Sequence, residues 1–126
     1  MNILAEISSD VHPTEDTARV ERAVLNIFPQ AKIEHADRCL RAFVNSLEGF
    51  EKLRMLIRSR RIRAAARALL MKGVKDDTVV FYLNKQAAYV GKVSFFEEGE
   101  TVALGPIKVV VKTDDPKKFV EWLTEY

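Results

Sequence analysis

Apolar residues in this chain recur with two different periods, and the order in which these periods follow one another limits the folds that it can form. Between residues 3 and 11 they alternate with polar residues, which is typical of a strand with one buried face. Between residues 14 and 29 they follow the spacing of a helix that ends at Pro29. Continued along the chain, these patterns predict the order strand, helix, two strands, two helices, three strands and a final helix.

Most of the predicted strands follow one another directly, as they do in hairpins. We therefore expect an α+β fold with an antiparallel or mixed sheet and with helices packed on one face. Thr14, Ser46 and either Asp114 or Asp115 are expected to cap helices. The segment 78–83, rich in β-branched and aromatic residues, is expected to be a strand buried on both faces. The remaining strands are expected at 31–37, 38–45, 91–96 and 106–113, with a helical turn or loop at 84–88 and a hairpin tip at 97–100.

Length and composition indicate one domain that spans residues 1–126 and has an apolar core of ordinary size. The longest uncharged run covers residues 23–31, whereas a helix that spans a membrane needs about 20 apolar residues. We expect no membrane segment and, because the first residues lack a secretory signal, a cytoplasmic protein. The single cysteine, Cys39, agrees with a reducing compartment.

The positive charge of the chain is concentrated in residues 52–75, called here the basic segment. This segment holds nine basic side chains and no acidic one, whereas residues 1–51 hold five and nine, and residues 76–126 hold six and nine. Such an asymmetry can direct an anionic partner to one face of a nearly neutral protein.

Six arginines of the basic segment are candidate RNA ligands, because a guanidinium group matches phosphate oxygens. In an unbroken helix, Arg54, Arg58 and Arg61 would lie on one strip and Arg60, Arg63 and Arg67 on a neighbouring one. A kink between residues 59 and 61 would separate them. Arg60 and Arg61 are the best candidates for an exposed pair, and the alternative is a solvated helix face without a ligand.

Two clusters could suggest a metal or a general base. One contains His12, Glu15 and Asp16, and the other contains His35 between Glu34 and Asp37. Neither has the ligand spacing of a known metal site, and helix capping explains Glu15 and Asp16 without chemistry. Phosphate loops and nucleophile motifs are also missing. We therefore expect no metal, no cofactor and no catalysis.

Aromatic residues near Lys85 and Lys92 offer a weak signal for base stacking. Tyr82, Tyr89 and the pair at 95–96 lie close to these lysines in the sequence, although aromatic residues on strands are usually part of the core.

Four stretches together resemble an uncharacterised archaeal protein family: Pro13-Thr14-Glu15-Asp16, residues 62–67, Phe81-Tyr82-Leu83-Asn84-Lys85-Gln86-Ala87-Ala88 followed by Gly91-Lys92-Val93, and Leu104-Gly105-Pro106-Ile107. That family is similar to predicted RNA-binding, exosome-associated archaeal proteins, and its fold resembles the ribosomal protein that binds 5S RNA. The resemblance implies a cytosolic protein that forms a homodimer and has no established enzymatic activity. It also draws attention to Asn84, Lys85 and Gln86, which either contact RNA or make buried hydrogen bonds.

The favoured hypothesis is a non-catalytic protein that binds RNA through Arg54, Arg58, Arg60, Arg61, Arg63, Arg67, Asn84, Lys85, Gln86 and Lys92. The alternative is a homo-oligomeric scaffold or protein-interaction module that does not bind nucleic acid. A third hypothesis is a hydrolase that uses His12 or His35.

Overall fold

The structure is a computed structural model that describes residues 1–59, 61–96 and 105–125. The predicted hairpin tip at 97–100 and the candidate residue Arg60 lie outside the described residues. The elements, in chain order, are β1 (Ile3–Asp10), α1 (Thr17–Ile27), β2 (Lys32–Ala36), β3 (Cys39–Val44), the 3-10 helix η1 (Leu47–Phe50), α2 (Glu51–Ser59), α3 (Arg63–Lys72), β4 (Val74–Lys75), β5 (Thr78–Asn84), α4 (Lys85–Tyr89), β6 (Phe95–Phe96), β7 (Pro106–Thr113) and α5 (Pro116–Thr124).

The strands form one sheet in the order β2-β3-β1-β7-β5-β4, and the short strand β6 also pairs with β5. Every pairing between the described strands is antiparallel. The expected α+β class is confirmed, and the antiparallel form of the sheet is the one observed. The two long central strands, β1 and β7, bring the start and the end of the chain together.

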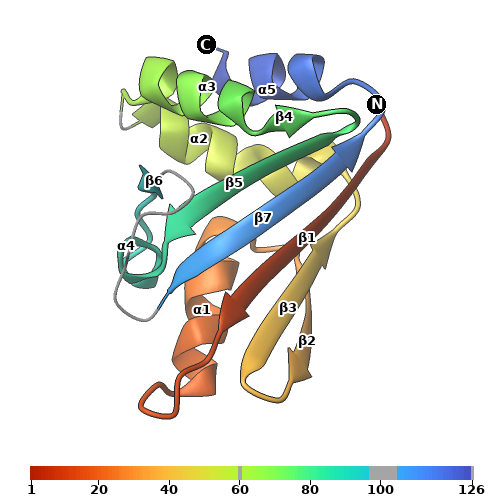
Figure 1. Ribbon diagram of the computed structural model, residues 1–126. Helices are drawn as coiled ribbons and strands as arrows, with labels where there is room; N and C mark the ends of the chain where they lie inside the picture. Colours follow the sequence, from red (N-terminus) through yellow and green to blue (C-terminus); the bar gives the residue numbers. More distant parts are fainter. Residues whose placement is uncertain (60, 97–104, 126) are drawn as a thin grey trace.

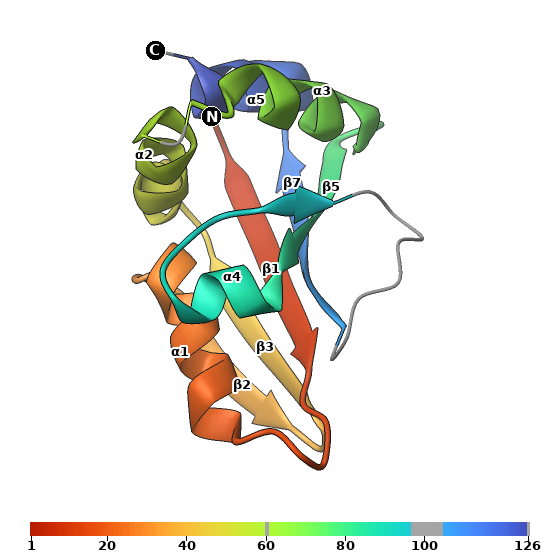
Figure 2. The same cartoon turned by 90° about the vertical axis from the view of Figure 1, so that its left-hand side faces the viewer.

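The helices that the structure describes cover one face of this sheet, and none of them lies on the other face. Figures 1 and 2 show α1, α2 and α4 on one side of the long strands, with α3 and α5 packed together at one end of the sheet. Every second residue of β1, β3, β5 and β7 is accordingly buried. The strand at 78–83 is therefore buried on one face only, and the prediction of two buried faces was wrong.

Three aromatic rings join the helices above the covered face. Phe50 of η1 packs edge-to-face against Phe28, which follows α1, and against Phe119 of α5, with ring centroids 5.6 and 5.1 Å apart. All three side chains are fully buried. Edge-to-face pairs of this kind contribute about 0.5–1.5 kcal/mol each beyond the burial of their area.

Several predicted boundaries differ from the structure for local reasons. Asp16, not Thr14, caps α1, because its carboxylate accepts a hydrogen bond from the amide of Ala18 at 3.0 Å. Ser46 precedes η1 without a capping bond from its side chain, and Asp115 caps α5. Of the strand predicted at 91–96, only β6 forms, because Gly91 adopts a φ of +73° and turns the chain out of α4.

Candidate nucleic-acid interface

The basic segment forms two helices instead of one. α2 ends at Ser59 and α3 begins at Arg63, and Arg61 in between has a φ of +55°, which an α-helix does not allow. The arginine strips expected of an unbroken helix are therefore divided. Arg54 and Arg58 lie on α2, Arg61 lies in the turn, and Arg63 and Arg67 lie on α3.

Arg54 joins α2 to the C-terminal helix. Its Nε donates a hydrogen bond to the backbone oxygen of Trp122 at 3.0 Å, and its Nη2 lies 3.0 Å from the carboxylate of Glu125. The guanidinium also lies over the indole ring of Trp122, 5.0 Å from its centroid, and a weaker ion pair with Glu51 measures 3.8 Å. Only 20% of the side chain is exposed, and two of its five N–H donors are used in these hydrogen bonds.

Three of the described arginines of the segment are more accessible to a ligand than Arg54. Arg58, Arg61 and Arg67 are exposed, whereas Arg63 is half-buried and has a partner of its own. These three exposed arginines come from α2, from the turn and from α3. They are the described arginines that best fit the predicted role in RNA binding.

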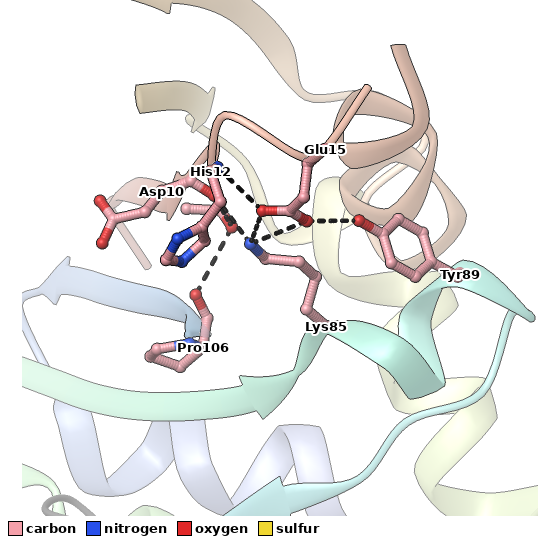
Figure 3. A network of polar contacts seen from close by, with 7 residues as sticks. Asp10, His12, Glu15, Lys85, Tyr89 and Pro106 are labelled. Carbon is pink, nitrogen blue, oxygen red and sulfur yellow. Dashed lines mark hydrogen bonds and ion pairs between the residues drawn. The ribbon is translucent and has the colours of Figure 1, made fainter. Parts of the chain in front are cut away.

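Lys85, a second predicted RNA ligand, is buried in a polar network (Figure 3). Its ammonium group donates to the backbone oxygen of Asp10 at 2.7 Å and lies 3.1 Å from a carboxylate oxygen of Glu15. The two side chains are only 1% and 5% exposed. This ion pair fastens the first turn of α4 to the segment between β1 and α1, 70 residues earlier in the chain.

Tyr89 and the backbone of His12 complete the coordination of Glu15. The Tyr89 hydroxyl donates to one carboxylate oxygen at 2.8 Å, and the His12 amide donates to the other at 3.0 Å. Burial by itself raises the pKa of Glu15, but these two hydrogen bonds and the Lys85 ammonium outweigh it and hold the pKa below its ordinary value of 4.5. Burial and the bond to Glu15 raise the pKa of Tyr89 from 10.0 to about 12.

The remaining predicted polar ligands differ in their surroundings. Asn84 caps α4, because its side-chain oxygen accepts a hydrogen bond from the amide of Ala87 at 3.1 Å. Gln86 and Lys92 are exposed. Of the run that the resemblance emphasised, Asn84 and Lys85 thus have structural partners, and Gln86 and Lys92 keep accessible side chains.

The shifted pKa values predict how stability changes at acidic and alkaline pH. Unfolded Glu15 takes up its proton at a higher pH than folded Glu15, so the stabilisation by the network is complete above about pH 4.5 and is lost as the pH falls through the lower folded pKa. For Tyr89 the contribution is complete below about pH 10 and is lost as the pH rises towards 12.

Urea unfolding of the wild type and of Glu15→Gln across this pH range would measure both effects. We expect the variant to begin less stable and to lose less stability in acid, and Tyr89→Phe to lose less in alkali. Parallel pH profiles for the wild type and both variants would contradict this assignment.

The two histidine clusters meet at one end of the molecule. His12, Glu15, His35 and Asp37 line the same cavity, which has a volume of about 480 Å³. Glu15 already accepts the bonds described above, and His35 lies 3.5 Å from Glu21. Within the described ranges, no group of three or more histidine, cysteine, aspartate or glutamate side chains is arranged to hold a metal ion.

The Glu15–Lys85–Tyr89 network is the polar feature that sequence reasoning missed. One signal was available, since Lys85 and Tyr89 are four residues apart and so lie on one face of a helix. Nothing in the spacing indicated Glu15 as their partner.

Among the described residues, no helix has the length and apolar character needed to cross a bilayer.

Comparisons with known proteins identify the family. A family model described as RNA binding matches residues 5–113. The chain is 44% identical to the UPF0201 protein of Pyrobaculum aerophilum over 119 residues, which cover 90% of this chain and 83% of that protein. It is 37% identical to the UPF0201 protein of Thermococcus onnurineus over 122 residues, which cover 94% and 88% of the two chains.

Solved structures agree with this relationship. The UPF0201 protein from Methanococcus jannaschii superposes with a TM-score of 0.82 and 38% identity, covering 97% of this chain and 99% of that one. A DUF54 protein from Methanothermobacter thermautotrophicus has a TM-score of 0.63, 18% identity and coverage of 99% and 100%, and shares the fold alone. The predicted association with exosomes and the predicted likeness to the 5S-RNA-binding ribosomal protein stay predictions. By its matches to the family model and to these archaeal relatives, the chain belongs to the UPF0201 family.

Proposed function

We propose that this chain binds RNA through the arginine side chains of the basic segment and catalyses no reaction. The observation that carries the proposal is a run of nine cations without an acid, of which Arg58, Arg61 and Arg67 are exposed. The description of the matching family model as RNA binding supports the same ligand.

The contacts of each cation suggest a division of roles. Arg54 is committed to Trp122 and Glu125, and we assign it to the positioning of α2 against α5. The exposed guanidinium groups of Arg58, Arg61 and Arg67 can approach phosphate oxygens without breaking such contacts. Gln86 and Lys92 lie on or after α4 and are proposed to add contacts at a second point.

A salt titration tests the proposal. RNA should bind more weakly as salt increases, and log K against log salt should have a slope of about −0.7 for each neutralised phosphate of a single strand, or about −0.9 for a duplex. Contacts from three exposed arginines therefore predict a slope of about −2 or steeper. The measurement is fluorescence anisotropy of labelled RNA at several salt concentrations.

Two results would count against RNA binding. One is the absence of binding to both single-stranded and duplex RNA at low salt. The other is an affinity that does not change with salt. A protein that forms homodimers in light scattering and recovers protein but no nucleic acid in a pull-down would instead favour the scaffold hypothesis.

A further inference from the structure

Figure 1 shows β5 and β7 from the side on which no described helix lies. The lysines on this side are exposed and the other side chains are half-buried, and Tyr82 makes a contact of its own. Thr78, Val80 and Tyr82 of β5 lie directly opposite Lys112, Val110 and Lys108 of β7. Lys75 of β4 lies opposite Thr78 and extends the row. We call this group of seven the open-face patch: Lys75, Thr78, Val80, Tyr82, Lys108, Val110 and Lys112.

The open-face patch has three positive charges, and two carboxylates border it: Asp77 accepts a hydrogen bond from Thr78 at 3.1 Å, and Glu6 lies opposite Val110. Lys75, Lys108 and Lys112 are exposed, and they make no ion pair within the part of the chain that the structure describes. On the neighbouring strand β1, Glu6 lies 3.6 Å from Arg41, which offsets its charge. The patch is therefore complementary to an anion, although the whole protein is nearly neutral.

The middle of the patch is apolar. Val80 and Val110 face each other across the ladder, and the Tyr82 ring lies next to them beside Lys108. Leu4 of β1 lies opposite Lys112 and is 58% exposed, an unusual position for a leucine on a central strand. Aromatic and apolar side chains between lysines form a surface on which unpaired bases can stack while their phosphates meet the cations.

We propose that the open-face patch binds a single-stranded RNA segment, with a base stacked on Tyr82 and phosphates near Lys108 and Lys112. The inference rests on the proposed RNA binding and adds a second surface to it. The basic segment and the open-face patch share one residue, because Lys75 is both the last residue of the segment and part of the patch. A duplex hides its base faces, so the patch favours unpaired RNA.

The test compares two pairs of variants by anisotropy with labelled oligouridine of about 12 nucleotides and with an RNA duplex of similar length. Lys108→Gln with Lys112→Gln removes two charges from the patch. Lys117→Gln with Lys118→Gln removes the same charge from exposed positions on α5. Tyr82→Leu removes the ring, and Tyr82→Phe keeps it. Thermal melting of each variant checks that it is folded.

We expect Tyr82→Leu to weaken oligouridine binding by about 5- to 150-fold and Tyr82→Phe to leave it unchanged. The patch lysine pair should reduce the steepness of the salt dependence by about 1.4, and the α5 pair should have no effect. Duplex binding should change less than oligouridine binding in both patch variants.

The outcomes separate this inference from the proposal on which it rests. If the wild type binds neither RNA, RNA binding itself is contradicted. If the wild type binds oligouridine, but the patch lysine pair behaves like the α5 pair and Tyr82→Leu like Tyr82→Phe, only the open-face patch is overturned. An equal loss of duplex and oligouridine binding would contradict the stacking of a base on Tyr82.

Discussion

Replacing Lys85 by methionine is expected to lower the free energy of unfolding by about 3–5 kcal/mol, the usual cost of removing one partner of a buried ion pair. The change leaves the carboxylate of Glu15, 5% exposed, without its counter-charge, and the backbone oxygen of Asp10 without its 2.7 Å donor. Methionine has a similar volume, so little of the loss should come from a cavity.

A urea unfolding series with a double-mutant cycle would measure this effect. Glu15→Leu alone should be destabilising for the converse reason, because it leaves a buried ammonium group unpaired. The double variant Glu15→Leu with Lys85→Met should lose clearly less than the sum of the two. Lys92→Met is the matched control, because Lys92 is an exposed lysine that follows the same helix. A loss below about 1 kcal/mol for Lys85→Met would contradict the structural role.

The same variants separate stability from RNA binding. Lys85 was predicted to contact RNA, and its ammonium group would have to leave Glu15 and Asp10 to reach a phosphate. If Lys85 acts only in the fold, the folded double variant should bind RNA with the affinity of the wild type. If the stable double variant instead binds RNA more weakly than the wild type, Lys85 contributes to the interface.

The strands and most helices were predictable because their signals are local. The alternation in residues 3–11 and 106–113 is a property of a few neighbouring residues, and the structure has β1 and β7 there. The order of the predicted strands and helices, together with the hairpin connections, then limited the sheet to an antiparallel or mixed one. The strand order, with β1 between β3 and β7, required contacts between residues about 100 positions apart, which no local pattern encodes.

The burial of charged residues was not predictable for the same reason. Lys85 follows a strand and looks like a surface lysine, and its burial depends on Glu15 and Asp10, which lie 70 and 75 positions earlier. Arg54 and Arg58 are four residues apart and so lie on the same side of α2. Of these two, Arg54 is the one that donates a hydrogen bond to α5, at the backbone oxygen of Trp122. Sequence spacing placed both arginines on α2 and could not tell which of them a distant helix would cover.

The open-face patch illustrates the converse case. Tyr82 lies near Lys85 and Lys92 in the sequence, whereas the strand register places it opposite Lys108. Lys108 and Lys112 alternate with buried residues of β7, so their exposure could be read from the period of that strand. The residues that lie opposite them, Tyr82 and Thr78, could not be predicted in this way, because they depend on which strand pairs with β7.

The largest effect on RNA affinity is expected from reversing the exposed charges of the basic segment. Changing Arg58, Arg61 and Arg67 to glutamate removes three cations and adds three anions on α2, the turn and α3. Each lost phosphate contact should weaken binding about fivefold at 0.1 M salt, so the three together should weaken it about 100-fold or more, with a salt dependence less steep by about 2. Anisotropy of labelled RNA against salt would measure both quantities.

The control must carry the same charge at other exposed positions. Arg22→Glu on α1 with Lys117→Glu and Lys118→Glu on α5 changes the net charge equally and leaves the basic segment intact. If RNA attraction came from overall charge, both triple variants would lose the same affinity. A loss confined to the first variant, with thermal melting unchanged in both, would locate the interface on the basic segment, whose nine cations have no acidic residue between them in the sequence.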